Sequence, residues 1–134
     1  MVEVEIRGKK FPLCLTVAAL DKVNEKCGGV KNIGAFLDGK QPDGTSNTAQ
    51  VICNTAWLLG LLIHEGEEAR FVLARFDGEK ADRRVVPDSV AISHLLTVAS
   101  VNKYRKAVFD AINESMSQEI EALYPKNVKD AEQE

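Results

Sequence analysis

The chain has few of the residues that build disulfide frameworks and metal centres. Its 134 residues include three cysteines and two histidines. Cys14, Cys27 and Cys53 are widely spaced, whereas disulfide frameworks and zinc sites need close pairs such as C-x-x-C. All three cysteines have apolar neighbours in the sequence. We therefore expect free, buried, structural thiols with no redox or metal-binding role.

Positive charge is scarce and scattered. The 17 Lys and Arg residues are outnumbered by 20 Asp and Glu residues, which gives a formal net charge of −3. The basic pair Arg83-Arg84 closely follows Glu79 and Asp82, as is typical of a solvated loop of mixed charge. A sequence-blind nucleic-acid binder needs a concentrated basic face. The sequence shows no such face, which argues against a sequence-blind nucleic-acid binder.

Signals for secretion and for membrane insertion are also missing. The amino-terminal residues MVEVEIRGKK include two acidic residues and no apolar core of a signal peptide. The densest apolar run, Ala49 to Ile63, would span about 22 Å as a helix, which is short of the roughly 30 Å of a hydrocarbon core. We expect a cytoplasmic protein that binds no membrane.

Motifs for nucleotide binding and for nucleophilic catalysis are absent as well. The sequence has no G-x-x-x-x-G-K-[ST], G-x-G-x-x-G or G-x-S-x-G pattern. His64-Glu65 invites a metal interpretation, but the second histidine that a zincin motif needs four residues later is missing. A histidine near a helix end also interacts favourably with the helix dipole. We expect a protein that is not an enzyme and has no cofactor; a small enzyme with an unrecognised site near His64 and Glu65 is one alternative.

The most informative segment is the apolar run Ala49 to Ile63, which contains the only tryptophan, Trp57. Part of it follows helical spacing, with Ile52, Ala56, Leu59 and Ile63 on one face. Further apolar residues lie off that face: Val51, Leu58, Leu61 and Leu62. A helix that is apolar nearly all round needs partners on more than one side. We predict a buried central helix from about Asn47 to Glu65, with Gly66 as the residue after its end.

Alternation of apolar residues predicts a β-hairpin over residues 1–16. The alternating residues are Val2, Val4 and Ile6 in the first strand and Phe11, Leu13 and Leu15 in the second. Gly8-Lys9-Lys10 is the expected turn. Because two strands alone are marginally stable, the hairpin must pack on helices or extend through another copy of the chain.

Capping residues predict the elements between the hairpin and the central helix. Thr16 suits the N-cap of a helix at residues 17–27, and Gly28 suits its C-terminal stop. Asn32 is the expected cap of a shorter helix through residues 33–37. The segment that follows, DGKQPDGTSN, is rich in turn formers and is expected to be a loop.

Beyond the central helix, we predict a separate helix over residues 67–76. Its expected inward residues are Ala69, Val72 and Leu73, and its expected outward residues are Glu67, Glu68 and Arg70. A polar loop at residues 77–86 follows. Pro87 suits the first turn of a short helix, whose expected apolar face is Val90, Ala91, Leu95 and Val98.

The last predicted element is a long amphipathic helix that begins at Ser100 or Asn102 and ends at Pro125. Its apolar residues recur at threes and fours: Val101, Tyr104, Val108, Ile112, Met116, Ile120 and Leu123. The polar segment 126–134 is expected to be disordered. The sequence thus predicts a predominantly α-helical α+β protein, with a single domain over residues 1–125 that contains the hairpin and about five helices.

Two parts of the chain resemble tail assembly chaperones of long-tailed bacteriophages. The first is the hairpin segment IRGKKFPL (Ile6 to Leu13), followed by LTVAALDKVNEKCGG (Leu15 to Gly29). The second is WLLGLLIHEG (Trp57 to Gly66), followed by VPDSV (Val86 to Val90) and two predicted helices. The resemblance covers nearly the whole chain and consists of apolar spacing and turn residues.

The resemblance implies a small, non-catalytic, mostly helical protein in the cytoplasm of a bacterial host. Members of this family bind the apolar helical tape measure protein and help tail-tube subunits assemble around it. An alternative within phage biology is a minor tail or connector protein that stays in the particle. A chaperone for a helical client needs exposed apolar surface.

Two helices have apolar residues that could form such a surface for a client or for a homo-oligomer. They are Trp57, Leu58, Leu61 and Leu62 on the central helix and Tyr104, Val108, Ile112 and Met116 on the last helix. The plainer interpretation is that each residue belongs to the core. We predict that another polypeptide covers the side from Trp57 to Leu62 for part of the protein's working life.

Overall fold

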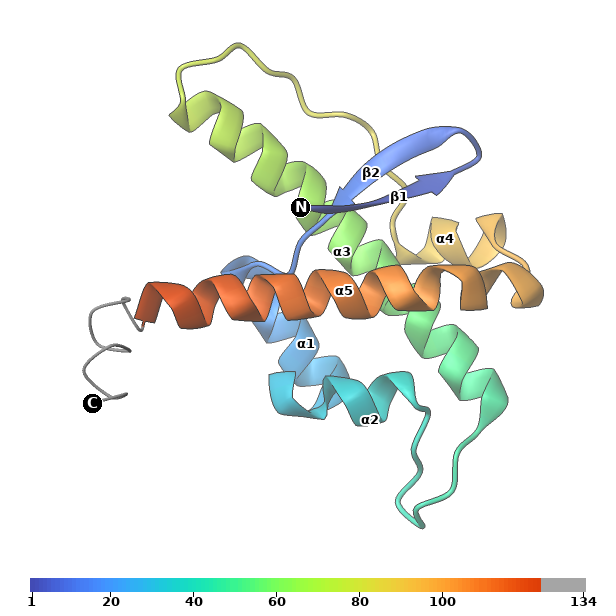
Figure 1. Cartoon of the computed structure of the whole chain (residues 1–134). Coiled ribbons are helices and arrows are strands. Elements are labelled where there is room, and N and C mark those ends of the chain that lie inside the picture. The colour runs from blue at the N-terminus through green and yellow to red at the C-terminus, as the bar shows by residue number, and fades with distance from the viewer. Residues whose placement is uncertain (124–134) are drawn as a thin grey trace.

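The protein folds as an N-terminal β-hairpin followed by helices, as the sequence predicts (Figure 1). The structure is a computed structural model that describes the backbone of residues 1–123 and the side chains of residues 1–117. Its elements are β1 (Val2–Ile6), β2 (Lys9–Leu13), η1 (Val17–Ala19), α1 (Leu20–Cys27), η2 (Val30–Asn32), α2 (Ile33–Leu37), α3 (Thr48–Phe76), α4 (Ser89–Leu95) and α5 (Val98–Leu123). The predicted helix end at Pro125 and the predicted disordered tail lie outside the described residues.

The hairpin pairs β1 and β2 in antiparallel register, with Val4 opposite Phe11. Its turn is Arg7-Gly8, and both residues have positive φ angles, 51° and 81°, which suit a two-residue hairpin turn. The predicted turn at residues 8–10 is therefore wrong, because Lys9 and Lys10 already pair within β2. The hairpin packs on α3 and α5 of the same chain, which meets its need for a covering layer.

The segment predicted as a helix over residues 17–27 consists of the 3₁₀ turn η1 and the helix α1. It ends at Gly28 in a left-handed conformation, as predicted. Thr16 and Asn32 do not act as the predicted side-chain caps. The Thr16 hydroxyl instead donates to the Glu65 carboxylate, and the Asn32 amide donates to the Gly28 carbonyl at 3.0 Å. Thr16 therefore connects the start of η1 to the middle of α3.

Helix α3 is continuous over 29 residues, so the predicted helix end at Gly66 is wrong. The helix begins as predicted, with the Asn47 side chain accepting a hydrogen bond from the Gln50 backbone N–H at 3.1 Å. Gly66 lies inside the helix, where a Cβ atom would be 1.9 Å from the Pro12 carbonyl oxygen. Gly66 therefore allows β2 to approach α3 closely and does not end the helix.

Beyond Gly66, the predicted buried and exposed sides of α3 are wrong. Glu67 is only 2% exposed, whereas Val72 and Leu73 are 56% and 54% exposed. The Glu67 carboxylate accepts hydrogen bonds from the Arg70 guanidinium and from both the backbone N–H and the guanidinium of Arg84. Burial of this charge is tolerated because its oxygens are fully satisfied by hydrogen bonds.

The Glu67 cluster holds the 77–88 loop against α3 and the hairpin. Arg84 bonds to Glu67 and also donates to the Lys10 carbonyl of β2 at 3.3 Å. Arg70 donates to the Asp82 carbonyl at 2.8 Å. The hydrogen bonds from Arg70, supported by those from Arg84, overcome the desolvation of the carboxyl and lower the pKa of Glu67 from 4.5 to about 2.

Helix α4 buries a residue other than those predicted. Ile92 is fully buried, while Val90 and Val98 are each 68% exposed, so the predicted apolar face is wrong. Asp88 is the N-cap of α4, and its carboxylate accepts from the Ala91 N–H at 2.8 Å. Pro87 therefore precedes the helix and does not lie in its first turn.

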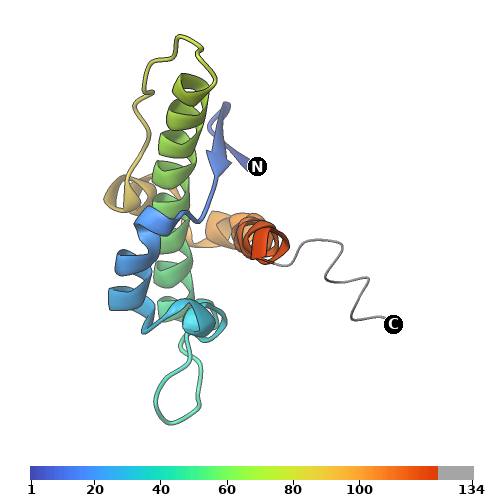
Figure 2. The ribbon, with the colours of Figure 1, turned by 90° about the vertical axis from the view of Figure 1, so that its left-hand side faces the viewer.

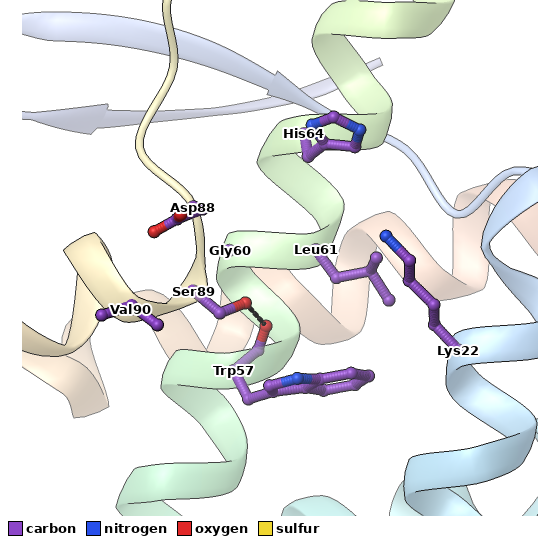
Figure 3. Close-up of a pocket in the computed structure, with 8 residues that line it drawn as sticks. All are labelled: Lys22, Trp57, Gly60, Leu61, His64, Asp88, Ser89 and Val90. Atoms are coloured by element: carbon purple, nitrogen blue, oxygen red, sulfur yellow. Dashed lines mark hydrogen bonds between the residues drawn. The ribbon is translucent and has the colours of Figure 1, made fainter.

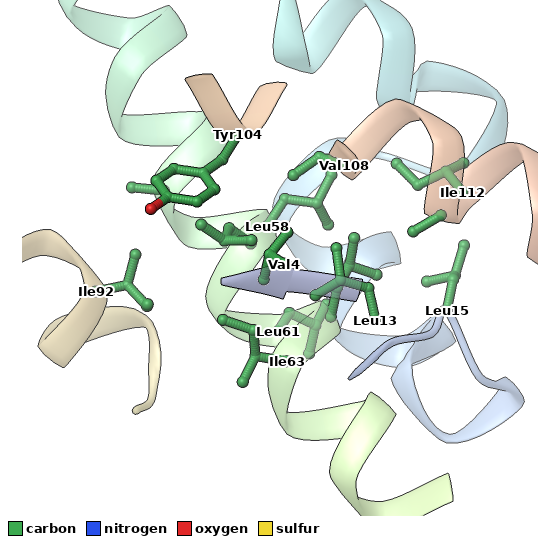
Figure 4. Packing of buried hydrophobic residues seen from close by; sticks show 14 of the residues in the cluster. Val4, Leu13, Leu15, Leu58, Leu61, Ile63, Ile92, Tyr104, Val108 and Ile112 are labelled. Carbon is green, nitrogen blue, oxygen red and sulfur yellow. The ribbon is translucent and has the colours of Figure 1, made fainter. Parts of the chain in front are cut away.

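Helix α5 crosses the middle of α3, while α1 and α4 lie on the other side of α3 (Figures 1 and 2). It begins at Val98, slightly earlier than predicted. The predicted periodic face is confirmed at its buried residues, Val101, Tyr104, Val108 and Ile112. The Tyr104 hydroxyl donates to the Glu5 carbonyl of β1 at 2.9 Å. The resulting core contains residues from the hairpin, α3, α4 and α5 (Figure 4).

Candidate functional site

Most of the predicted partner surface is core. Six of its eight residues are buried within the chain, which makes the prediction of an exposed surface wrong for Leu58, Leu61, Leu62, Tyr104, Val108 and Ile112. Trp57 and Met116 are partly buried. The apolar side of α3 that seemed to lack a cover packs against α4 and β2, as well as against α5.

Two glycines in α3 allow these covering elements to come close. A Cβ atom at Gly60 would lie 2.5 Å from Ser89 Cα at the start of α4, and Gly66 meets Pro12 of β2 in the same way. A glycine inside a helix costs about 1 kcal/mol relative to alanine, so two of them in one helix indicate close packing. The two glycines are thus the feature of the sequence that indicates that other elements pack closely on α3.

A pocket of about 340 Å³ remains at Trp57, on the side of α3 that faces α1 and α4 (Figure 3). Its lining comes from three separate elements. The residues are Lys22 of α1, Trp57, Gly60, Leu61 and His64 of α3, and Asp88, Ser89 and Val90 at the start of α4. The volume lies at the lower end of the range for ligand pockets and suits one or two apolar side chains.

The indole of Trp57 is held in place on two sides. The Phe36 ring meets it edge-on, with 5.8 Å between ring centroids and an interplanar angle of 78°. Lys26 Nζ lies 5.7 Å from the indole centroid. The tryptophan is therefore a fixed, partly buried side chain at the edge of the core.

The polar groups of the pocket at the start of α4 are occupied by structural hydrogen bonds. Ser89 Oγ donates to the Trp57 carbonyl at 2.8 Å, and the Asp88 carboxylate caps α4. The remaining charged groups near the indole are basic: Lys22, Lys26 and, when protonated, His64. The pocket therefore favours an apolar group that carries negative charge beside it.

His64, Ser89 and Asp88 line one pocket, which raises the question of a catalytic triad. In the described part of the chain, no hydrogen bond joins His64 to Ser89 or Asp88, and both of these have structural partners. His64 Nε2 lies 3.8 Å from the Glu65 carboxylate, which accepts from Thr16. Ser89 and Asp88 thus contribute to the packing of α4 on α3 and to the cap of α4.

The described residues contain no candidate metal-ligand cluster and no candidate membrane-spanning helix. No group of three or more His, Cys, Asp or Glu side chains there could hold a metal ion. Nor does any helix of residues 1–123 have the length and apolar character needed to cross a membrane.

The three thiols are free, as predicted, but they differ in exposure. Cys14 and Cys27 are half-buried, and burial raises the pKa of both thiols. Cys53 is exposed on α3, so the prediction of a buried environment is wrong there.

A second apolar surface lies at the end of α3. It consists of Ala69, Val72, Leu73 and Phe76, and we call it the terminal face. Phe76 is 87% exposed, and Ala69 is partly buried. The sequence predicts an inward apolar face here, and the single chain leaves it open.

Comparison of the chain with protein-family models, curated proteins and solved structures finds no match. A functional proposal therefore rests on the geometry of the Trp57 pocket and on the sequence resemblance.

Proposed function

We propose that the protein is a non-enzymatic tail assembly chaperone of a long-tailed phage or prophage. It binds apolar helical segments of the tape measure protein and assists the assembly of tail-tube subunits in the cytoplasm of the bacterial host. The resemblance of residues 6–29, 57–66 and 86–90 to this family supports the proposal. The structural observation that carries it is the partly buried Trp57, which lines an apolar pocket between α1 and α4.

In this proposal, an amphipathic client helix lies over α3 and inserts one apolar side chain beside Trp57. Burying a single large side chain in such a pocket contributes about 1.5–3 kcal/mol. Lys22 and Lys26 favour client helices that have acidic residues beside the inserted side chain. This is recognition of a helix in a groove, which needs no rearrangement of the core.

Val90 allows a test that leaves the fold intact. Val90→Glu puts a charge at the pocket wall on a residue that is 68% exposed. Co-expression of this variant with the tape measure protein should recover at least tenfold less soluble complex than wild type. The control is Val98→Glu, because Val98 has the same exposure, also lies at a helix start and does not line the pocket.

We expect Val98→Glu to keep the tape measure protein as soluble as wild type does. If Val90→Glu also solubilises it fully, the Trp57 pocket does not bind the client. If wild type neither binds nor solubilises it, the chaperone assignment fails. Mass spectrometry of purified particles distinguishes a chaperone, which should be missing from finished tails, from a minor tail or connector component.

A further inference from the structure

We infer that the terminal face of α3 pairs with the same face of a second copy of the chain, with the two helix ends antiparallel. Ala69, Val72, Leu73 and Phe76 are spaced at i, i+3, i+4 and i+7, so they lie on one side of the helix. The inference rests on this face alone and does not depend on tape measure binding.

The terminal face continues a buried face of α3. Leu62 precedes Ala69 by seven residues, and Phe76 follows Ala69 by seven, so the three lie along one stripe. Leu62 is fully buried, whereas Phe76 is 87% exposed. Figure 1 shows that the last turns of α3 extend past α5 and the hairpin, so the stripe runs on after its cover has ended.

The charges beside this face complement each other when the face is turned by a two-fold axis. Glu68 and Arg75 lie along one edge of the face, seven residues apart, and Arg70 and Asp77 lie along the other edge with the signs reversed. In an antiparallel pair each edge meets its own copy, so Glu68 approaches Arg75 of the second copy and Arg70 approaches Asp77 of the second copy. Arg75 and Asp77 have no ion pair among the described residues of their own chain, whereas Glu68 already pairs with Arg83 and Arg70 with Glu67, so each contact across the pair would be shared with an existing one.

Shape favours the antiparallel pairing over a parallel one. The antiparallel pair places Ala69, the smallest residue of the face, opposite Phe76 of the second copy, so that small and large side chains interlock. A parallel pair would instead place Phe76 against Phe76 and Ala69 against Ala69, so that large side chains meet at one level and small ones at the other.

The size of the face sets the strength of the dimer. Val72, Leu73 and Phe76 together expose on the order of 300 Å² per copy, well below the roughly 800 Å² per partner of a standard interface. The dimer should therefore be reversible, with a dissociation constant of about 10 µM to 1 mM.

Sedimentation velocity of the full chain across about 10 µM to 1 mM tests the inference. Wild type should shift from monomer to dimer, and Phe76→Glu should weaken dimerisation at least tenfold. Val98→Glu should dimerise as wild type does, because Val98 is an exposed apolar residue far along the chain from the face. A wild type that stays monomeric, or a Phe76→Glu variant that dimerises equally well, would overturn the inference.

Disulfide trapping tests the orientation in a Cys53→Ser background. Ala69→Cys alone should not cross-link, because the two copies of residue 69 lie about 10 Å apart along an antiparallel pair. A mixture of Ala69→Cys and Phe76→Cys chains should form the mixed disulfide. Cross-linking of Ala69→Cys with itself and not with Phe76→Cys would indicate a parallel pair and contradict the proposed arrangement.

Discussion

Gly66→Ala should destabilise the protein by about 3 kcal/mol and lower its melting temperature by roughly 10 °C. The new Cβ atom would lie 1.9 Å from the Pro12 carbonyl oxygen and 2.5 Å from the Pro12 carbonyl carbon. Both are backbone atoms, so no side-chain rotation relieves the clash and β2 must move away from α3. This movement outweighs the gain of up to about 1 kcal/mol that alanine brings to a helix interior.

Gly34→Ala is the matched control, because Gly34 also lies in a helix and a Cβ atom there would meet nothing within 4 Å. It should leave the melting temperature unchanged or raise it slightly. Thermal unfolding followed by circular dichroism compares the two variants. If Gly66→Ala is as stable as Gly34→Ala, β2 does not pack on Gly66 as described.

Glu67→Gln should cost about 2–3 kcal/mol of folding free energy at pH 7. The substitution removes a buried charge that accepts hydrogen bonds from Arg70 and Arg84. It also replaces one acceptor oxygen by an amide NH₂ group, which faces the N–H donors of these arginines and cannot accept from them. Arg70 and Arg84 are partly exposed, so water can hydrogen-bond to their guanidinium groups after the substitution. The cost is therefore lower than that of leaving a fully buried charge unpaired. Glu68→Gln is the matched control, because Glu68 is a third exposed and its one ion pair among the described residues is with Arg83, so its loss should cost at most about 1 kcal/mol.

The same variant should change how stability depends on pH. The pKa of Glu67 is lowered from 4.5 to about 2 in the folded protein, so its contribution is complete above pH 4.5 and is lost as the pH falls toward 2. Urea unfolding should show a difference between wild type and Glu67→Gln that is largest at pH 7 and shrinks steadily below pH 4.5. A difference that is the same at pH 7 and pH 3 would show that Glu67 is not the stabilising carboxylate.

Elements with local signals could be predicted from the sequence. The period-two alternation of β1 and the repeat on α5 each specify which face is buried, without reference to distant residues. Gly28 and Asn47 end and begin their helices through contacts within a few residues. These features were therefore predictable from the sequence.

The errors come from contacts between residues far apart in the chain. Gly66 resembles a helix stop until Pro12 is seen against it. Glu67 is a charged residue and is therefore expected at the surface. It is buried because Arg84, 17 residues later in the chain, donates a hydrogen bond to its carboxylate. The excess apolar side of α3 is covered because Gly60 allows α4 to approach.

The candidate site was partly predictable for the same reason. Trp57 stands out in the sequence as the only tryptophan, and His64 beside Glu65 invites a metal interpretation. Lys22 and Val90 reach the pocket from separate helices, and no spacing in the sequence connects them to Trp57. The opening of the terminal face could not be predicted, because its periodicity is the same whether it is covered by this chain or by another.

The fluorescence of Trp57 tests the central proposal most directly, because it is the only tryptophan in the chain. The titrant is a helical, tryptophan-free segment of the tape measure protein. With wild type, the emission should shift to shorter wavelength and the shift should saturate as the client side chain covers the indole. The Val98→Glu variant should respond in the same way. With Val90→Glu, at least tenfold more segment should be needed for the same shift. Saturable binding of the segment with no change in Trp57 emission would contradict the assignment of this pocket as the client site.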